Sequence, residues 1–239
     1  MLITARKYYL SYNMLKINPL GENIINQNNL SGSNENADLW LFGDSRISRW
    51  NENDFSSIAG TTINFGIEGQ TTSQVLFRFK NQLTKDTSRW VLLEVGINDL
   101  KLIGLDRAQA GMIKETCYSN ILSIVKLCKE HNVNIIVINI FPTGDIEFLR
   151  RFVWNDSVDL AIAEINDRLK SYCIDNDIFY FDAYSLLTGI GSDNNVKKMY
   201  QEDFLHINSD GYKLLTQNLI NQYGDLIASK NNNAIQRVK

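Results

Sequence analysis

From Asp38 onward, short apolar runs alternate with longer helical patterns, and this alternation constrains the fold more than any other feature. Continuous apolar or β-branched runs of this length are typical of strands buried on both faces of a parallel sheet. Strands alternating with helices predict a three-layer α/β/α sandwich around a doubly wound parallel sheet of about five strands. The expected strands are Leu39–Phe42, Thr61–Phe65, Trp90–Val95, Val133–Ile140 and Ile178–Phe181, and the expected helices are Ser73–Leu83, Arg107–His131, Val158–Cys173 and Ser209–Ile227.

The 239 residues suffice for one large domain or two small ones. Residues 1–37 read as an arm followed by a loop, because residues 21–36 are rich in Asn, Gly and Ser. The alternating pattern places a single domain at residues 38–230, and residues 231–239 form a polar tail.

Charge and apolar content exclude several kinds of partner. A formal net charge of -3 with scattered cations argues against a nucleic acid. The longest apolar stretch, Val133–Phe141, is too short to span a bilayer, and no signal-peptide pattern follows Met1. Three cysteines, Cys117, Cys128 and Cys173, are too few and too far apart for a disulfide framework or a thiolate metal site. We therefore expect a cytoplasmic protein without metal or cofactor, whose oligomeric state the sequence leaves open.

Polar or glycine residues follow the carboxyl ends of three expected strands. Ser45, Gly69 and Asn98 each lie just past such an end, and His206 precedes the last expected helix. In doubly wound sheets, ligands bind beyond the carboxyl ends of the strands. The pattern therefore predicts a site on this edge of the sheet.

Ser45, in the sequence Gly43-Asp44-Ser45, is the candidate nucleophile. A serine hydroxyl needs a neighbouring base before it attacks, and the backbone N–H groups at a strand-to-helix turn can stabilise negative charge. The alternative is that Asp44 or Ser45 only caps the following helix. Taken alone, the tripeptide favours the cap.

Gly69 and Asn98 are candidate oxyanion donors, together with the backbone N–H of Ser45. A backbone N–H approaches a reacting oxygen most closely where no side chain intervenes, and the Asn98 amide offers uncharged donors. Both also have a structural interpretation: Gly66 and Gly69 as turn glycines, and Asn98 in an Asn-Asp turn. Asp99 is better suited to a turn or cap than to chemistry.

Asp203 and His206 are the candidate acid and base. Residues three apart are neighbours on a helical turn, so the carboxylate can hold one ring nitrogen while the other faces Ser45. The chain has only two histidines, and the other, His131, ends an expected helix. An Asp-x-x-His is by itself more often a structural pair, but its combination with the preceding motifs favours catalysis.

Taken in order, these four motifs resemble the SGNH/GDSL hydrolase family. The chain lacks the Gly-x-Ser-x-Gly elbow of α/β-hydrolases, and its acid lies three residues before the histidine. The segment 64–72, Asn-Phe-Gly-Ile-Glu-Gly-Gln-Thr-Thr, with 75–78 after it, is similar to the acetylhydrolase branch typified by platelet-activating-factor acetylhydrolase. Met199-Tyr200 and Gly211-Tyr212 fit that branch too. The resemblance covers Asp38 to the last helix.

The resemblance implies a flavodoxin-like fold and a metal-independent acyl-enzyme mechanism on short acyl, above all acetyl, esters of a small molecule, carbohydrate or lipid. Arg46 departs from the family, which often has leucine there. It either lines the pocket or, preferably, pairs with an acid such as Glu68. Other candidate substrate-binding residues are Asp44, Phe148, Phe152 and Trp154; the segment Thr143–Asn155, which holds the last three, is equally well an ordinary packed loop.

Three other functions remain open at this stage. An acyltransferase would use the same Ser45 with a sugar hydroxyl as acceptor, and a non-catalytic binding module would keep only the fold. A nucleotide-binding protein would need a glycine-rich phosphate loop, which the sequence lacks. For the esterase, activity should fall below pH about 6–7, where an ordinary imidazole takes up a proton.

Overall fold

A computed structural model of the chain describes residues 12, 37–84, 88–145, 154, 156–188 and 195–229. The expected arm, apart from residues 12 and 37, and the expected tail lie outside the described residues. The same holds for Phe148 and Phe152, so their predicted role in the pocket stays a prediction.

Five parallel strands form the central sheet, as the apolar runs predict. They are β1 (Ala37–Gly43), β2 (Thr62–Gly66), β3 (Ser88–Glu94), β4 (Asn134–Ile138) and β5 (Phe179–Phe181), in the order β2-β1-β3-β4-β5. β1 lies between β2 and β3, and its last residue, Gly43, pairs with Gly66 on one side and Glu94 on the other. The register therefore brings the ends of three strands to one place.

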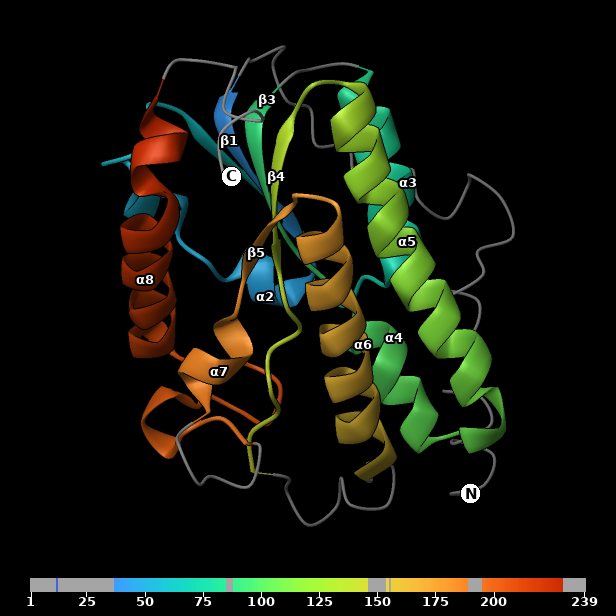
Figure 1. The fold of residues 1–239 in the computed structure, drawn as a ribbon. Helices are drawn as coiled ribbons and strands as arrows, with labels where there is room; N and C mark the ends of the chain where they lie inside the picture. The colour runs from blue at the N-terminus through green and yellow to red at the C-terminus, as the bar shows by residue number, and fades with distance from the viewer. Residues whose placement is uncertain are drawn as a thin grey trace.

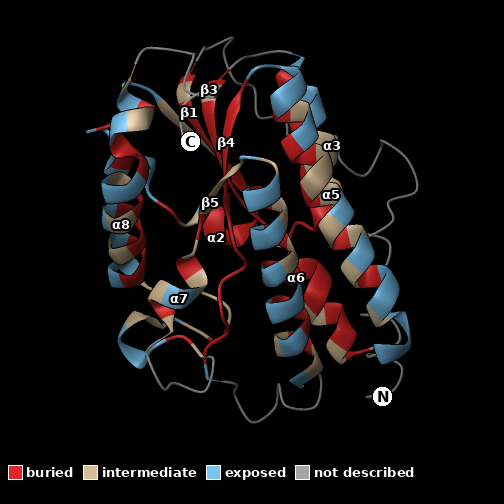
Figure 2. Cartoon of the chain, viewed as in Figure 1, coloured by how far each residue is buried: buried red, intermediate tan, exposed pale blue. Residues whose placement is uncertain are grey.

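Helices cover both faces of the sheet and complete the three predicted layers (Figure 1). Side chains of α3 (Thr72–Leu83), α5 (Ala110–Glu130) and α6 (Asp156–Asp175) share one hydrophobic core, and those of α7 (Ala183–Leu187) and α8 (Ser209–Ala228) share the other. Side chains of β1 alternate between these cores: Trp40 and Phe42 enter the first, Leu39 and Leu41 the second. Such alternation is the two-residue period of a strand. Buried residues of the helices face the sheet in Figure 2.

Short helices follow the carboxyl ends of three strands, outside the ranges that periodicity predicts as helical. They are α2 (Ser45–Ser48) after β1, α4 (Ile97–Leu100) after β3 and α7 after β5, toward the lower end of the sheet in Figure 1. Four or five residues are too few to show a helical period. The remaining short segments are the 3-10 turns η2 (Glu52–Phe55), η3 (Lys101–Gly104), η4 (Arg107–Gln109) and η6 (Lys198–Tyr200).

The cysteines are core residues. Cys117 and Cys128 on α5 and Cys173 on α6 are buried and free. None of the helices in the described segments is long and apolar enough to cross a membrane.

Candidate active site

Ser45, His206 and Asp203 form a hydrogen-bonded chain, although Ser45 lies 161 positions from His206 in the sequence. The Nε2 atom of His206 lies 3.0 Å from the Oγ of Ser45, and its Nδ1 atom lies 2.8 Å from the Oδ2 of Asp203. An ionised carboxylate only accepts hydrogen bonds, so Nδ1 carries the proton and Nε2 is free to accept one from Ser45. The structure thus brings together the three residues that the sequence singled out.

The loop of residues 201–208, here the base loop, holds this arrangement through local contacts. The Oδ1 of Asp203 accepts hydrogen bonds from the backbone N–H groups of Leu205 and His206, at 2.7 and 2.9 Å. Burial acts to raise the pKa of Asp203, but these bonds and the one from the His206 ring outweigh it and lower the pKa. Asn208 ends the loop and caps α8 by accepting from the N–H groups of Asp210 and Gly211.

Asp44 positions the turn that carries Ser45. It is the N-cap of α2, and its Oδ1 accepts from the N–H of Arg46 at 3.0 Å. The side chain is fully buried. Asp44 is therefore a cap, and its expected contact with substrate is wrong because no part of it reaches the surface. Burial raises the pKa of Asp44, although the charges of Arg46 and Lys101 act in the other direction.

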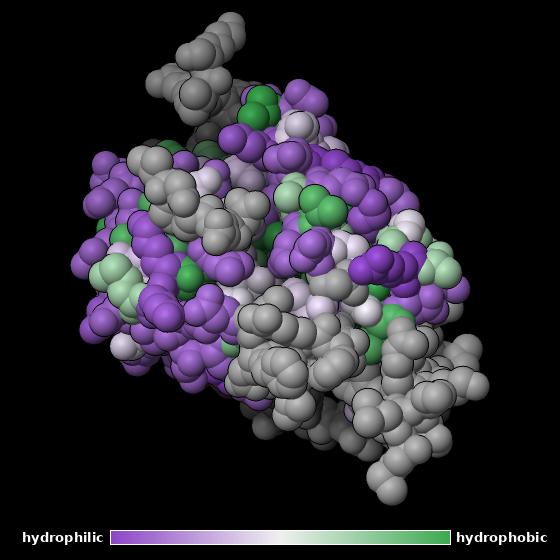
Figure 3. All heavy atoms as spheres, turned by 90° about the horizontal axis from the view of Figure 1, so that it is seen from below, coloured by the Kyte–Doolittle hydropathy of each residue, from purple (hydrophilic) through white to green (hydrophobic). Residues whose placement is uncertain are grey.

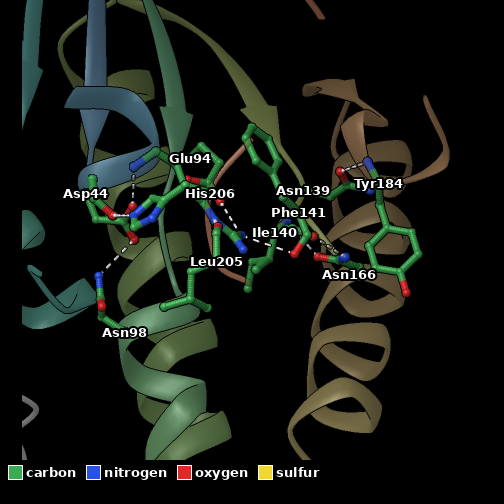
Figure 4. Close-up of polar contacts among 12 residues, drawn as sticks. Asp44, Glu94, Asn98, Asn139, Ile140, Phe141, Asn166, Tyr184, Leu205 and His206 are labelled. Atoms are coloured by element: carbon green, nitrogen blue, oxygen red, sulfur yellow. Dashed lines mark hydrogen bonds and ion pairs between the residues drawn. The ribbon is translucent and has the colours of Figure 1, made fainter. Parts of the chain in front are cut away.

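Arg46 is also fully buried and binds three segments of the chain through Glu94, Phe141 and Leu205, which are labelled in Figure 4. Its Nε donates to the carbonyl of Leu205 at 3.1 Å, and its Nη1 donates to Glu94 at 3.3 Å and to the carbonyl of Phe141 at 3.1 Å. The expected pocket role is wrong, because the guanidinium has no exposed surface. The preferred ion pair exists, but Glu94 and not Glu68 is the partner.

Asp44, Arg46, Glu94 and Asp99 together form what we name the buried polar cluster; all four are 0% exposed. Burial and the charge of Asp44 raise the pKa of Glu94, and Arg46 opposes this. Burial also raises the pKa of Asp99 to about 7. Asp99 accepts from the backbone and the hydroxyl of Thr72, at 2.9 and 2.6 Å. It therefore links α4 to the start of α3, whose N-cap is Thr71, and does not serve a turn at the end of its own strand as predicted.

Asn98 faces Asp44 and the turn after β2. Its Nδ2 donates to the carbonyl of Gln70 at 3.0 Å and to the Oδ2 of Asp44 at 3.3 Å, and Figure 4 shows the second of these bonds. Its Oδ1 accepts from the Nζ of Lys101 at 2.6 Å. Asn98 is only 4% exposed, so the amide is held in a fixed orientation beside the nucleophile turn.

Two glycines, Gly66 at the end of β2 and Gly69 after it, are needed for different structural reasons. Gly69 has a φ of 71°, a left-handed conformation that favours glycine. Gly66 ends β2, and a Cβ there would lie 2.1 Å from the backbone nitrogen of Ser48. Gly66 is thus a close-approach residue at the strand end, which lets α2 pack against β2, and Gly69 is the turn glycine.

An exposed ion pair network borders the site. Arg49 lies 3.5 Å from Glu68, next to Gly69, and 3.2 Å from Glu202, next to Asp203. It therefore links the two loops that carry the candidate donor and acid. Sequence reasoning missed Arg49, Lys101 and Glu94; of these only Glu94, a charge at the end of an apolar strand, carried a visible signal.

Trp154 is the one aromatic candidate of the pocket that the structure describes. It is 5% exposed, and its ring packs edge-on against Phe204 at a centroid distance of 5.1 Å. This contact fits the alternative of a packed loop residue. Seen from below, the described surface at this end of the sheet is mostly hydrophilic, with small separate hydrophobic areas (Figure 3). Within the described segments, no group of three or more His, Cys, Asp or Glu side chains could bind a metal ion.

An α/β/α sandwich with a serine, histidine and aspartate at the carboxyl edge of its sheet defines a class of hydrolase folds. Residues 36–214 match the GDSL-like lipase/acylhydrolase family. The chain belongs to this family, as the four motifs predict, and is by class a hydrolase.

Solved structures agree with the fold. A Bacteroides fragilis protein described as an acylhydrolase is 26% identical, with 80% of this chain and 88% of that chain covered and a TM-score of 0.65. A Streptococcus pneumonia protein described as a platelet activating factor is 20% identical over 93% and 98%, with a TM-score of 0.66. An acetyl-xylooligosaccharide esterase from Geobacillus is 16% identical over 81% and 95%, with a TM-score of 0.61. A search of curated proteins by sequence gave no match.

Proposed function

We propose that the protein is a serine esterase that cleaves short acyl esters through an acyl-enzyme on Ser45. The observation that carries this proposal is the chain of contacts from Ser45 through His206 to Asp203, at 3.0 and 2.8 Å. Distances in this range allow a base to take the proton of a nucleophile directly.

The reaction has two halves. Ser45 Oγ forms a bond to the ester carbonyl carbon while its proton moves to the Nε2 of His206. The tetrahedral intermediate then breaks its bond to the alcohol, which leaves with that proton. In the second half, water gives a proton to His206 as its oxygen attacks the acyl carbon. The second tetrahedral intermediate then breaks its bond to the Oγ of Ser45, which takes that proton back from His206 as the acid leaves. Asp203 stays ionised and stabilises the imidazolium.

Three donors would hold the oxyanion: the backbone N–H groups of Ser45 and Gly69 and the amide of Asn98. The Asn98 contact to Asp44 is longer than its contact to Gln70, 3.3 against 3.0 Å. We therefore expect the oxyanion to compete for the hydrogen that points to Asp44. Donors of this kind act mainly in the transition state, where the charge has formed.

The substrate is proposed to be a small molecule, carbohydrate or lipid that carries a short acyl group, with acetyl preferred. This follows the resemblance of residues 64–72 to acetylhydrolases, and a solved neighbour is an acetyl-xylooligosaccharide esterase. No cofactor is required for the chemistry, since the chain supplies the nucleophile, base and donors. We place the protein in the cytoplasm as part of the same proposal.

Turnover of p-nitrophenyl esters from acetate to long acyl chains tests the proposal. Ser45→Ala should lose activity by about 10⁴-fold or more. Ser48→Ala is the matched control, because Ser48 lies on the same short helix and is exposed; it should keep wild-type activity. Ser45→Ala that retains turnover would overturn the proposal, and a preference for long acyl chains would overturn the acetyl assignment.

A further inference from the structure

Lys101 lies outside the motifs that define the family, but its ammonium group contacts Asn98, one of the proposed oxyanion donors. It lies at the start of η3, three residues after Asn98, and is half-buried. Its Nζ donates to the Oδ1 of Asn98 at 2.6 Å. We propose that Lys101 is a positioning residue that makes the Asn98 amide a stronger and correctly oriented oxyanion donor; this rests on the proposed function.

The orientation follows from the inventory of donors and acceptors. A lysine ammonium only donates, whereas the carbonyl of Gln70 and an ionised Asp44 only accept. The amide of Asn98 therefore has its oxygen on Lys101 and its nitrogen on Gln70 and Asp44. Gln70 and Asp44 hold the amide nitrogen of Asn98, and Lys101 holds its oxygen. Lys101 therefore opposes a flip of the amide that would turn this oxygen toward the substrate.

The charge matters because the surroundings of Asn98 are acidic. Asp44 lies 3.3 Å from its nitrogen, and Asp99 follows it in the chain. Burial raises the pKa of both acids, which shows how poorly this region accommodates negative charge. An oxyanion would add another negative charge to this region. The charge of Lys101 acts on this region, because it opposes the raised pKa of Asp44.

The effect should appear in kcat and not in KM. A neutral ester carbonyl gains little from a polarised amide, whereas the oxyanion of the transition state gains much. Hydrogen bonds with one charged partner are worth more than neutral ones, so Lys101→Met should lower kcat by about tenfold. KM and the melting temperature should stay near the wild-type values. Lys101→Arg keeps the charge and should recover part of the loss.

The decisive experiment is a double-mutant cycle on p-nitrophenyl acetate with Lys101→Met, Asn98→Ala and the two combined. Lys126→Met on α5 is the control, because Lys126 is an exposed lysine that pairs with Glu130 within its own helix. If Lys101 acts through Asn98, Lys101→Met should change kcat less than about twofold in the Asn98→Ala background. Equal losses in both backgrounds, or no loss in the single variant, would overturn the proposal.

Ser45→Ala in the same series separates the two hypotheses. If turnover requires Ser45 but Lys101→Met is fully active, the role of Lys101 fails and the esterase stands. If turnover does not require Ser45, both fail.

Discussion

The base loop and the buried polar cluster both contact the turn that carries Ser45, and polar contacts have different consequences in each. In the base loop, the side chains of Asp203 and His206 are 42% and 14% exposed. In the cluster, those of Arg46 and Glu94 are 0% exposed. Water reaches the first region and not the second. We infer that contacts of the base loop mainly determine reactivity, and that those of the cluster mainly determine stability and the position of the nucleophile turn.

Arg46 joins the two regions. It follows Ser45 in the chain, pairs with Glu94 at the end of β3 and donates to the carbonyl of Leu205, the residue before His206. The hydroxyl of Tyr212 donates to its backbone carbonyl at 2.7 Å and ties α8 to the same turn. A buried ion pair is weak evidence of net stability, but losing one partner leaves an uncompensated buried charge.

The largest expected effect lies in the base loop. Asp203→Asn should lower kcat/KM for p-nitrophenyl acetate by about 10³–10⁴-fold, because the amide no longer orients and stabilises the imidazolium. Stability should change little, since the Asp203 side chain is 42% exposed. Thermal unfolding alongside the kinetics checks both. A variant that is strongly destabilised but fully active when folded would contradict the comparison.

The next effect lies in the cluster. Arg46→Met should lower the free energy of unfolding by about 3–5 kcal/mol, since Glu94 is left buried without its partner. Urea unfolding measures it. Replacing both, Arg46→Met with Glu94→Met, should cost less than Arg46→Met alone. If the double variant is as unstable as the sum of the single variants, the pair is not coupled and the cluster is wrongly described.

The pH dependence of stability is a further test of the buried polar cluster. Burial raises the pKa of Asp99 from 3.8 to about 7. Between these values the folded protein keeps a proton that the unfolded chain has lost, so the free energy of unfolding falls as pH rises through this window. The decrease is a few kcal/mol at most. Urea unfolding at several pH values should show a shallower decrease for Asp99→Asn, and an unchanged slope would contradict the assignment.

The smallest effect is expected at the exposed border. Arg49→Ala removes the contacts to Glu68 and Glu202, whose side chains are 65% and 53% exposed. Such pairs contribute about 1 kcal/mol or less. Urea unfolding should therefore show a small change, reduced further in high salt. A loss as large as that of Arg46→Met would show that exposure does not separate the two kinds of contact.

The sequence predicted the strands, the long helices and the chemical core of the site, because each depends on local signals. The strand Trp90–Val95 differs from β3 (Ser88–Glu94) by one or two residues, and the helix Ser73–Leu83 differs from α3 by one. Periodicity and motif spacing report such features directly.

The contacts that could not be predicted from the sequence depend on strand register and on segments that are distant in the chain. Glu94 became the partner of Arg46 because β1 and β3 pair with Gly43 opposite Glu94, a choice that no local pattern contains. The burial of Arg46 and Asp44 likewise depends on how the strand ends meet, and it is the reason why their expected roles in the pocket were wrong. The contact of Lys101 with Asn98 is local, but it runs from α4 into η3, which follow each other directly and are each too short to show a helical period.

The position of a covalent adduct is the most direct evidence on whether Ser45 is the nucleophile. The folded protein is treated with a fluorophosphonate, digested, and mapped by peptide mass spectrometry. We expect modification at Ser45, strongly slowed in His206→Ala and absent in Ser45→Ala. Modification of a different serine, or none on folded wild-type protein, would contradict it.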